Sequence, residues 1–376
     1  MNNPPKILIF HSALAPYRID YFNALAEKFD TKVIILYKNN YNQHFDQNKL
    51  LANCHFKVEY LNNKILIRNR ACFGFLKNIL KYKPDIVIGG EYNPSAFIPL
   101  FWKKILFLKY KIFTICDDSL SIANECKGIR KILRNFLIRK FDGIFVLSNE
   151  VAQWYSSHYK LNYTPIVFPI IRNEDKYRNQ LFNSLYISNQ YIEKYHLQGY
   201  KTILYIGRLA PEKNINYIIK AFSQVHTNKV KLLIIGDGEE KNNLIQLCKS
   251  LHVQDKVIFP GRFEGNELIA WYNLSEIFIL ASLYEPYGAV VNEALAAGCY
   301  VLCSQFAGSS VLIQDGNNGH IFNPLNNQLP ELIKLYLKKV QEIPYPSTKL
   351  KDNKMKEHFN QYTDDVINNL NKVLRK

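Results

Sequence analysis

Two glutamates eight positions apart are the residues of this chain whose type and spacing most clearly suit chemistry. Glu285 lies in a stretch with proline and glycine that predicts a loop, and Glu293 lies in the segment 289–297, which is rich in helix formers. The apolar run 277–281 before them predicts a buried strand. The first turn of the helix offers unpaired N–H groups to a phosphate, and the two carboxylates suit sugar hydroxyls. This combination predicts a nucleotide-sugar site.

Two cations follow another predicted strand. The apolar run 203–206 leads into the segment 207–214, which contains Arg208 and Lys213. At the carboxyl end of a strand, these two side chains would face an anion. For the glutamates alone, chance spacing or a favourable helix dipole is an equally good explanation. The cationic segment and the glutamate pair together favour the binding site.

These elements, in series with several glycine-containing motifs, resemble the retaining glycosyltransferases of family 4, which belong to the glycosyl transferases group 1. The resemblance covers nearly the whole chain and is densest between Gly207 and Phe322. Its further motifs are Gly236-Asp237-Gly238, Gly261-Arg262-Phe263, the segment 293–298 and the segment 315–319. The resemblance implies the α/β GT-B fold, in which two Rossmann-like, doubly wound parallel-sheet domains face each other across a cleft.

The resemblance also implies roles for particular residues. Arg208 and Lys213 would bind the donor diphosphate, Glu285 would contact the transferred sugar, and Glu293 would bind the ribose hydroxyls. Asp118 would replace a histidine that often contacts the donor sugar in this family, with capping of the next helix as the alternative. The other expected donor-binding residues are Gly207, Tyr287, Gly288, Ala289 and Val290, with Arg262 and Phe263 beside the base.

Length and periodicity predict two α/β domains. A chain of 376 residues exceeds the size at which one core usually stops growing. Short apolar runs alternate with helical patterns, as in βαβ units. The expected strands are 7–10, 33–36, 86–88, 112–115 and 144–147, then those starting at 203, 232, 257, 277 and 300. We therefore expect two domains, over 1–168 and 201–352, with a linker over 169–200 between them and a helix over 353–376. The resemblance implies that the first domain is the acceptor side, that the second binds the nucleotide-sugar, and that the last helix crosses back to the first domain.

Composition excludes several classes of protein. A hydrophobic content of 48% and an aromatic content of 14% exclude a disordered chain. No run of about 18 apolar residues and no secretory pattern is visible, so we expect a cytoplasmic protein. The seven cysteines form no Cys-x-x-Cys pair, which argues against a disulfide framework and a structural zinc site.

The expectation for cofactors is none. The exit of the first predicted strand, 10–18, contains no glycine, so the turn that binds nicotinamide and flavin dinucleotides is absent. Neither Asp117-Asp118 nor Asp364-Asp365 has the Asp-x-Asp spacing that sends two carboxylates to one side of a strand, so no metal is expected. His11 and Arg18 near this exit are either donor-directed or structural.

The positive charge is concentrated in the first half of the chain. Residues 1–199 contain 28 Lys and Arg against 15 Asp and Glu, a net +13 of the total +16. Within them, 127–141 and 100–111 are basic segments that also contain apolar and aromatic residues. Such segments suit an anionic membrane surface, and ordinary packed helices with a solvated basic face are the alternative. No nucleic-acid-binding motif accompanies the charge, so nucleic acid is not expected as a partner.

These observations lead to one preferred function. We expect a retaining hexosyltransferase, peripheral on the inner face of the cell membrane, that moves a sugar from a nucleoside-diphosphate-sugar to a glycan or lipid-linked saccharide in surface polysaccharide biosynthesis. The alternatives are a phosphorylase or sugar epimerase of the same fold, and a non-catalytic scaffold that binds nucleotide or membrane.

Overall fold

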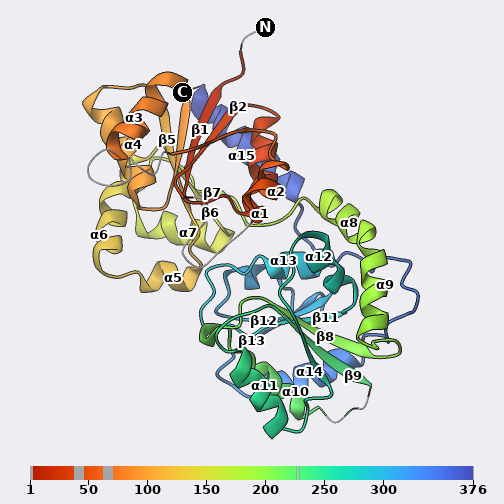
Figure 1. Cartoon of the computed structure of the whole chain (residues 1–376). Helices are drawn as coiled ribbons and strands as arrows, with labels where there is room; N and C mark the ends of the chain where they lie inside the picture. The colour runs from red at the N-terminus through yellow and green to blue at the C-terminus, as the bar shows by residue number, and fades with distance from the viewer. Residues whose placement is uncertain (1–2, 38–45, 62–70, 226, 228, 376) are drawn as a thin grey trace. The chain divides into compact units, whose positions relative to one another are not determined.

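The chain forms two compact units, each with its own parallel sheet. The computed structural model describes residues 3–37, 46–61, 71–225, 227 and 229–375. Unit 1 comprises Met1–Ile170 and Phe359–Lys376, and unit 2 comprises Ile171–His358 (Figure 1). No helix among these described residues is long and apolar enough to cross a membrane.

Unit 1 is built on a parallel sheet in the order β3-β2-β1-β4-β5-β6-β7. Its central strands consist mainly of isoleucine, valine, leucine and phenylalanine and have helices on both faces, so all but their end residues are buried. The five predicted strands are confirmed, and two short strands, β3 and β7, were not predicted. The strands are β1 (Lys6–His11), β2 (Asp30–Ile35), β3 (Lys57–Tyr60), β4 (Ile86–Gly90), β5 (Lys111–Cys116), β6 (Gly143–Val146) and β7 (Ile166–Val167).

Helices cover this sheet and include the C-terminal helix of the chain. The described helices are α1 (Pro16–Ala26), α2 (Gln47–Leu51), α3 (Ala71–Tyr82), α4 (Pro94–Ile105), α5 (Leu120–Glu125), α6 (Gly128–Leu137), η2 (Ile138–Lys140), α7 (Asn149–His158) and α15 (Phe359–Leu374). The ring of Phe359 in α15 packs 4.7 Å from that of Tyr21 in α1. The last helix therefore begins six residues later than the predicted segment and belongs to unit 1.

Unit 2 has a parallel sheet in the order β10-β9-β8-β11-β12-β13. The predicted strands are again confirmed, and only β13 was missed among the described strands. The strands are β8 (Lys201–Ile206), β9 (Val230–Ile235), β10 (Val257–Gly261), β11 (Ile277–Leu280), β12 (Tyr300–Ser304) and β13 (Gly319–Phe322). Their inward residues form one core with the covering helices, and Ile203, Leu232 and Ile279 in it are fully buried.

The predicted linker, 169–200, requires a correction. Most of it forms two helices that belong to unit 2 rather than a connection between domains. Asn173 caps the first of them, and buried tyrosines such as Tyr177 and Tyr191 fix both, although the polar sequence hides this periodicity. The helices of unit 2 are α8 (Glu174–Asn183), α9 (Leu185–Lys194), η3 (Pro211–Lys213), α10 (Ile215–Ser223), α11 (Lys241–Ser250), α12 (Gly265–Asn273), α13 (Val290–Ala296), η4 (Gly308–Leu312) and α14 (Leu329–Leu337).

Candidate functional site

The order of strands in unit 2 locates its ligand-binding edge. Strands β8 and β11 are neighbours, and the chain continues from them toward opposite edges of the sheet. Ligands of open α/β sheets bind at such a switch point, beyond the carboxyl ends of the strands. The segment 207–214 follows β8 and the segment 281–289 follows β11. Both sequence motifs therefore lie at the same switch point.

An ion pair joins these two segments. Nζ of Lys213 donates to Oε2 of Glu285 across 2.6 Å, and the two side chains are only 17% and 14% exposed. A lysine ammonium has three donors, so this contact leaves two for another acceptor. Lys213 thus keeps two donors for an anion such as a sugar phosphate, and Glu285 lies beside it.

The second predicted cation is also paired, but it is more exposed. Arg208 donates to Glu212, which lies four residues further along the chain, and the Arg208 side chain is 46% exposed. The backbone carbonyl of Glu212 accepts a hydrogen bond of 2.8 Å from the amide of Leu283. Glu212 therefore orients Arg208 and fastens the two loops to each other.

A third segment, not predicted as part of the site, holds the Glu285 loop. The amide of Gly308 donates to the carbonyl of Glu285 at 3.1 Å, and the amide of Ser309 donates to the carbonyl of Tyr287 at 2.8 Å. A Cβ on Gly308 would lie 2.2 Å from the carbonyl oxygen of Pro286, so only glycine allows this approach. Gly288 has φ +91°, which glycine adopts without strain.

Glu293, the other glutamate of the motif, lies on α13 and is held by two donors. Its Oε2 accepts from the hydroxyl of Tyr272 at 2.9 Å, and its Oε1 lies 3.3 Å from Nη1 of Arg172. Burial, and then the nearby Glu293 carboxylate, raises the pKa of Tyr272 well above its ordinary value, so this tyrosine remains a donor. Sequence reasoning missed Arg172 because it fell in the predicted linker.

The remaining predicted donor-side residues are more dispersed. Tyr287 is buried, and the segment from Gly288 to Val290 leads into α13. The Gly207 amide is already used, because it donates to the carbonyl of Ile235 at 3.0 Å. Arg262 and Phe263 follow β10, which is two strands, and hence about 10 Å, from β8. The roles of these residues in binding stay predictions.

Unit 1 has its own charged cluster at the carboxyl edge of its sheet. Nη2 of Arg130 lies 2.6 Å from Oδ1 of Asp118 and 3.1 Å from Oε2 of Glu91. Asp118 is buried, whereas Arg130 and Glu91 are about one-third exposed. Burial raises the pKa of Glu91, and Arg130 partly opposes this shift. Ser119, not Asp118, caps α5, so the capping alternative for Asp118 is wrong.

Arg18, Asp117 and His11 form the neighbouring part of this edge. The fully buried Arg18 pairs with Asp117, and its guanidinium lies 5.4 Å from the ring centroid of Phe168. The Nδ1 of His11 lies 2.8 Å from the carbonyl of Ala13, and burial together with Arg18 lowers the pKa of His11 to about 4. These contacts favour the structural interpretation of His11 and Arg18.

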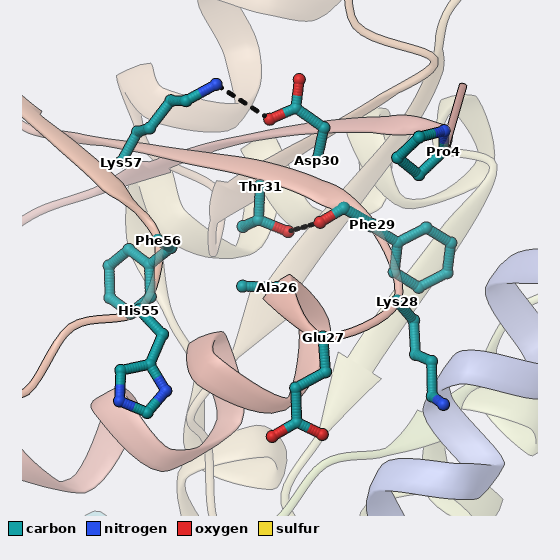
Figure 2. Close-up of a pocket in the computed structure, with 10 residues that line it drawn as sticks. All are labelled: Pro4, Ala26, Glu27, Lys28, Phe29, Asp30, Thr31, His55, Phe56 and Lys57. Carbon is teal, nitrogen blue, oxygen red and sulfur yellow. Dashed lines mark hydrogen bonds and ion pairs between the residues drawn. The ribbon is translucent and has the colours of Figure 1, made fainter.

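A surface hollow of unit 1 lies elsewhere. It is formed by residues at the amino ends of β2 and β3, where Nζ of Lys57 lies 3.3 Å from Oδ1 of Asp30 (Figure 2). No predicted site residue is among the residues that line it. Because ligands of such sheets bind at the carboxyl edge, this hollow is not part of the candidate site.

Comparisons with known proteins match part of the chain to one family. The family model of glycosyl transferases group 1 matches residues 188–357. The chain is 31% identical to alpha-monoglucosyldiacylglycerol synthase of Streptococcus pneumoniae, over 52% of the chain and 45% of that protein. It is 23% identical to the amylovoran biosynthesis glycosyltransferase AmsD of Erwinia amylovora, over 73% of the chain and 76% of that protein.

A solved structure extends the likeness to the whole chain. Anabaena HepE, crystallised in complex with UDP, superposes with a TM-score of 0.75 over 98% of this chain and all of that one, at 15% identity. At this identity the likeness shows the fold. By contrast, the chain spans only about a third to a half of the first curated relatives it matches. The chain therefore carries a glycosyl transferases group 1 domain within the two-domain GT-B fold.

Proposed function

We propose that the chain is a retaining glycosyltransferase that transfers a hexose from a nucleoside-diphosphate-sugar to a glycan or lipid-linked saccharide. The observation that carries the proposal is the convergence of Lys213 and Glu285 at the switch point of unit 2, with Glu293 on the following helix. The group 1 domain and the UDP complex of the structurally similar HepE support a nucleotide donor.

The chemistry assigned to this site is electrostatic. During transfer, the bond between the anomeric carbon and the diphosphate oxygen breaks, and the acceptor oxygen bonds to that carbon on the same face. The proton of the acceptor hydroxyl ends on the released diphosphate. Lys213 and Arg208 stabilise the charge that develops on the leaving oxygen, so the proposal requires no metal. Glu285, fixed by Lys213 and by the 307–309 segment, would contact the transferred sugar.

Unit 1 is proposed to bind the acceptor. Glu91 and Arg130 are the accessible members of its charged cluster, and a carboxylate beside a guanidinium suits sugar hydroxyls. Asp118 is buried behind Arg130, which favours a role in orienting Arg130 over the direct sugar contact expected from the sequence. Glu91 has φ +42°, and strained backbone of this kind clusters at functional sites.

The proposed acceptor is presented at an anionic membrane on the cytoplasmic side. Ten of the twenty large apolar side chains that are exposed in the described part of the chain lie on α3, α4, α6 or the turn after α4. Phe107, the most exposed, is 88% exposed, and Ile129 and Ile132 on α6 are 77% and 67% exposed. A soluble protein that exposes apolar side chains in one region often binds a partner there.

Charge supports an anionic partner for this face. The segments 71–84, 92–116 and 126–141, which contain α3, α4 and α6, have no Asp or Glu. Desolvation, and then the positive charge of Lys104 at the end of α4, lower the pKa of Lys140 in η2. Figure 1 shows α3, α4 and α6 on one side of unit 1. Lysines around apolar side chains suit an anionic bilayer.

The structure also corrects the expectation for α6. Arg130 and Arg134 lie in the segment 127–141 that was predicted to face an anionic membrane, with a solvated basic face as the alternative, but Arg134 is buried and donates to the carbonyl of Ala123 at 2.8 Å. Arg130 pairs with the charged cluster described above. Lys127, Lys131 and Arg139 are exposed and remain available to lipid.

A donor screen tests the proposed activity. Purified protein is incubated with UDP-, GDP-, ADP- and dTDP-hexoses, and the released nucleoside diphosphate is measured with and without a lipid-saccharide extract. We expect release from one donor class that increases with acceptor. Phosphate-dependent cleavage of a glycan would indicate a phosphorylase, and isomerisation of the sugar without transfer would indicate an epimerase. If no donor binds or reacts, the proposed function is wrong.

A further inference from the structure

The carboxylate of Glu293 is fixed from two sides. The Tyr272 hydroxyl donates to one oxygen, and Arg172 contacts the other. Arg172 and Glu293 are 16% and 18% exposed, so their contact is largely shielded from water. A carboxylate offers about four lone-pair positions. Two positions therefore remain, in directions that Tyr272 and Arg172 determine.

Arg172 is itself fixed at both its backbone and its side chain. Its backbone amide donates to Oδ1 of Asn292 across 2.8 Å. Asn292 directly precedes Glu293 in the sequence. Its Nη2 lies 3.3 Å from Oε1 of Gln180, and its guanidinium lies 5.1 Å from the ring centroid of Tyr177. Contacts with Asn292, Gln180 and Tyr177 of unit 2 therefore hold both the backbone and the side chain of Arg172 in place.

A neighbouring arginine, Arg178, has contacts typical of a purely structural role. Arg178, one turn into α8, donates to the backbone carbonyls of Ala296 at 2.9 Å and Lys351 at 3.0 Å. These contacts hold segments of unit 2 together and involve no carboxylate. Arg172 instead contacts a partly exposed carboxylate of the candidate site, so its position has a consequence for a bound ligand.

We infer that Arg172 is a positioning residue that aims Glu293 at the two adjacent ribose hydroxyls of the donor, and that the chain thereby selects ribonucleoside over deoxyribonucleoside diphosphates. The inference rests on the proposed function and on the role in ribose binding that the family resemblance implies for Glu293. When a donor lacks one hydroxyl, a shielded lone pair of Glu293 stays unpaired, and a site built to bind a hydroxyl rejects such an analogue.

Calorimetry on the whole chain tests this selectivity. UDP and 2′-deoxy-UDP are the probes, with ADP and GDP and their 2′-deoxy forms if the donor screen selects another base. We expect the wild-type protein to bind UDP at least tenfold more tightly than 2′-deoxy-UDP. Arg172→Gln should reduce this ratio to about two, and Arg172→Lys should restore part of it.

Arg178→Gln is the matched control, because it removes an arginine of the same segment without touching Glu293. It should lower the melting temperature yet keep the wild-type ratio. A purely structural role for Arg172 would give the same result, so an unchanged ratio in Arg172→Gln overturns the inference. Should Arg172→Gln not fold, the ratio in Arg172→Lys decides in the same way.

Two further outcomes also count against the inference. A wild-type ratio near one would show that Glu293 does not read the ribose. Equal weakening of UDP, 2′-deoxy-UDP and inorganic pyrophosphate by Arg172→Gln would show that Arg172 contacts phosphate directly. If the wild-type protein binds no nucleoside diphosphate, the proposed function itself fails, and that result differs from a lost or absent selectivity.

Discussion

Lys213 and Glu285, 72 residues apart in the chain, form a hydrogen-bonded ion pair of 2.6 Å at the switch point of unit 2. Each group follows a different strand, and both side chains are mostly buried. Breaking a pair of this kind leaves one charge shielded and uncompensated, which costs more than the pair contributes. The two positively charged residues of the site should therefore respond differently to substitution.

Replacing either cation should lower turnover, but only one replacement should affect folding. Lys213→Ala and Arg208→Ala should each lower turnover about 10²-fold, because each removes a positive side chain that would stabilise the negative charge developing on the diphosphate. Lys213→Ala should also lower the free energy of unfolding by about 1–3 kcal/mol, since it leaves Glu285 unpaired. Arg208 is about half exposed, so its replacement should change the free energy of unfolding little. Urea unfolding measures the free energy of unfolding and steady-state kinetics measure the turnover. Replacement of the exposed Lys220 by Ala is the control. Near wild-type turnover in both variants would refute the diphosphate site.

Glu285→Gln should separate nucleotide binding from chemistry. The substitution removes the negative charge beside Lys213, so the affinity for the bare nucleoside diphosphate should stay constant or rise a few-fold. Turnover should fall, because the contact with the transferred sugar is lost. Glu293→Gln should instead weaken nucleotide binding by about 1.5–3 kcal/mol. Calorimetry compares the two variants, and an equal loss of affinity in both would contradict the separate roles.

The stereochemistry of the product tests the assignment as a retaining enzyme. Proton NMR of the initial product should show the anomeric configuration of the donor. Activity should survive EDTA, because Lys213 and Arg208 are proposed to neutralise the leaving diphosphate. An inverted product would reassign the mechanism. Activity that chelation abolishes and Mn²⁺ or Mg²⁺ restores would mean that a metal supplies the missing charge.

Membrane binding should depend on both charge and apolar insertion. Replacing Lys127, Lys131 and Arg139 by Gln should weaken binding to anionic vesicles, and binding of the wild type should fall steeply between roughly 0.05 and 0.5 M salt. Replacing Ile129, Ile132 and Phe136 by Ser should weaken binding at all salt concentrations.

Cosedimentation with vesicles measures this binding. Leu325→Ser and Leu335→Ser remove exposed leucines of unit 2 and serve as the matched control for lost apolar surface. These controls should pellet like the wild type. If the α6 variants also pellet like the wild type, α6 is an ordinary packed helix with a solvated face.

The stability of the protein should fall in mild acid because of His11. The folded-state pKa is about 4, below the ordinary value of 6.5, so the unfolded chain takes up a proton first as the pH decreases. The stability contribution is complete above pH 6.5 and is lost as the pH falls toward 4, by about 1–3 kcal/mol. Thermal unfolding from pH 7.5 to 4.5 measures this loss. His11→Gln should flatten the profile, the exposed His158→Gln should not, and parallel curves for His11→Gln and wild type would contradict the prediction.

The fold could be predicted from the sequence because its central strands are continuous apolar runs. Strands with weaker patterns, such as the four-residue β3 and two-residue β7, were missed. The predicted linker was wrong because α8 is polar and packs through only two buried residues, Tyr177 and Leu181. Periodicity in one sequence does not reveal such packing.

The site was predicted where residues lie in motifs and missed where only tertiary contacts connect them. Glu285 and Lys213 follow strands that are neighbours in the sheet, so their meeting could be foreseen. Arg172 and Tyr272 contact Glu293 from distant segments that carry no motif. The sequence did contain a feature that could have indicated Glu91 as a site residue, since Glu91 follows two glycines at the end of a predicted strand. Arg130 was assigned to the membrane-binding segment because helix periodicity does not identify its carboxylate partners.

Unit 2 is one uninterrupted insertion within unit 1, and both of its ends are anchored at a single place. Nδ1 of His358, its last residue, lies 3.2 Å from Oε1 of Glu174 near its start. In unit 1, the ring of Tyr21 packs against the tilted rings of both Phe168 and Phe359, which flank the two crossing points. Exchange of one gene segment, the codons for 171–358, would therefore replace all of unit 2 without cutting either sheet. Hybrid proteins that pair unit 1 of one relative with unit 2 of another are accessible by this route.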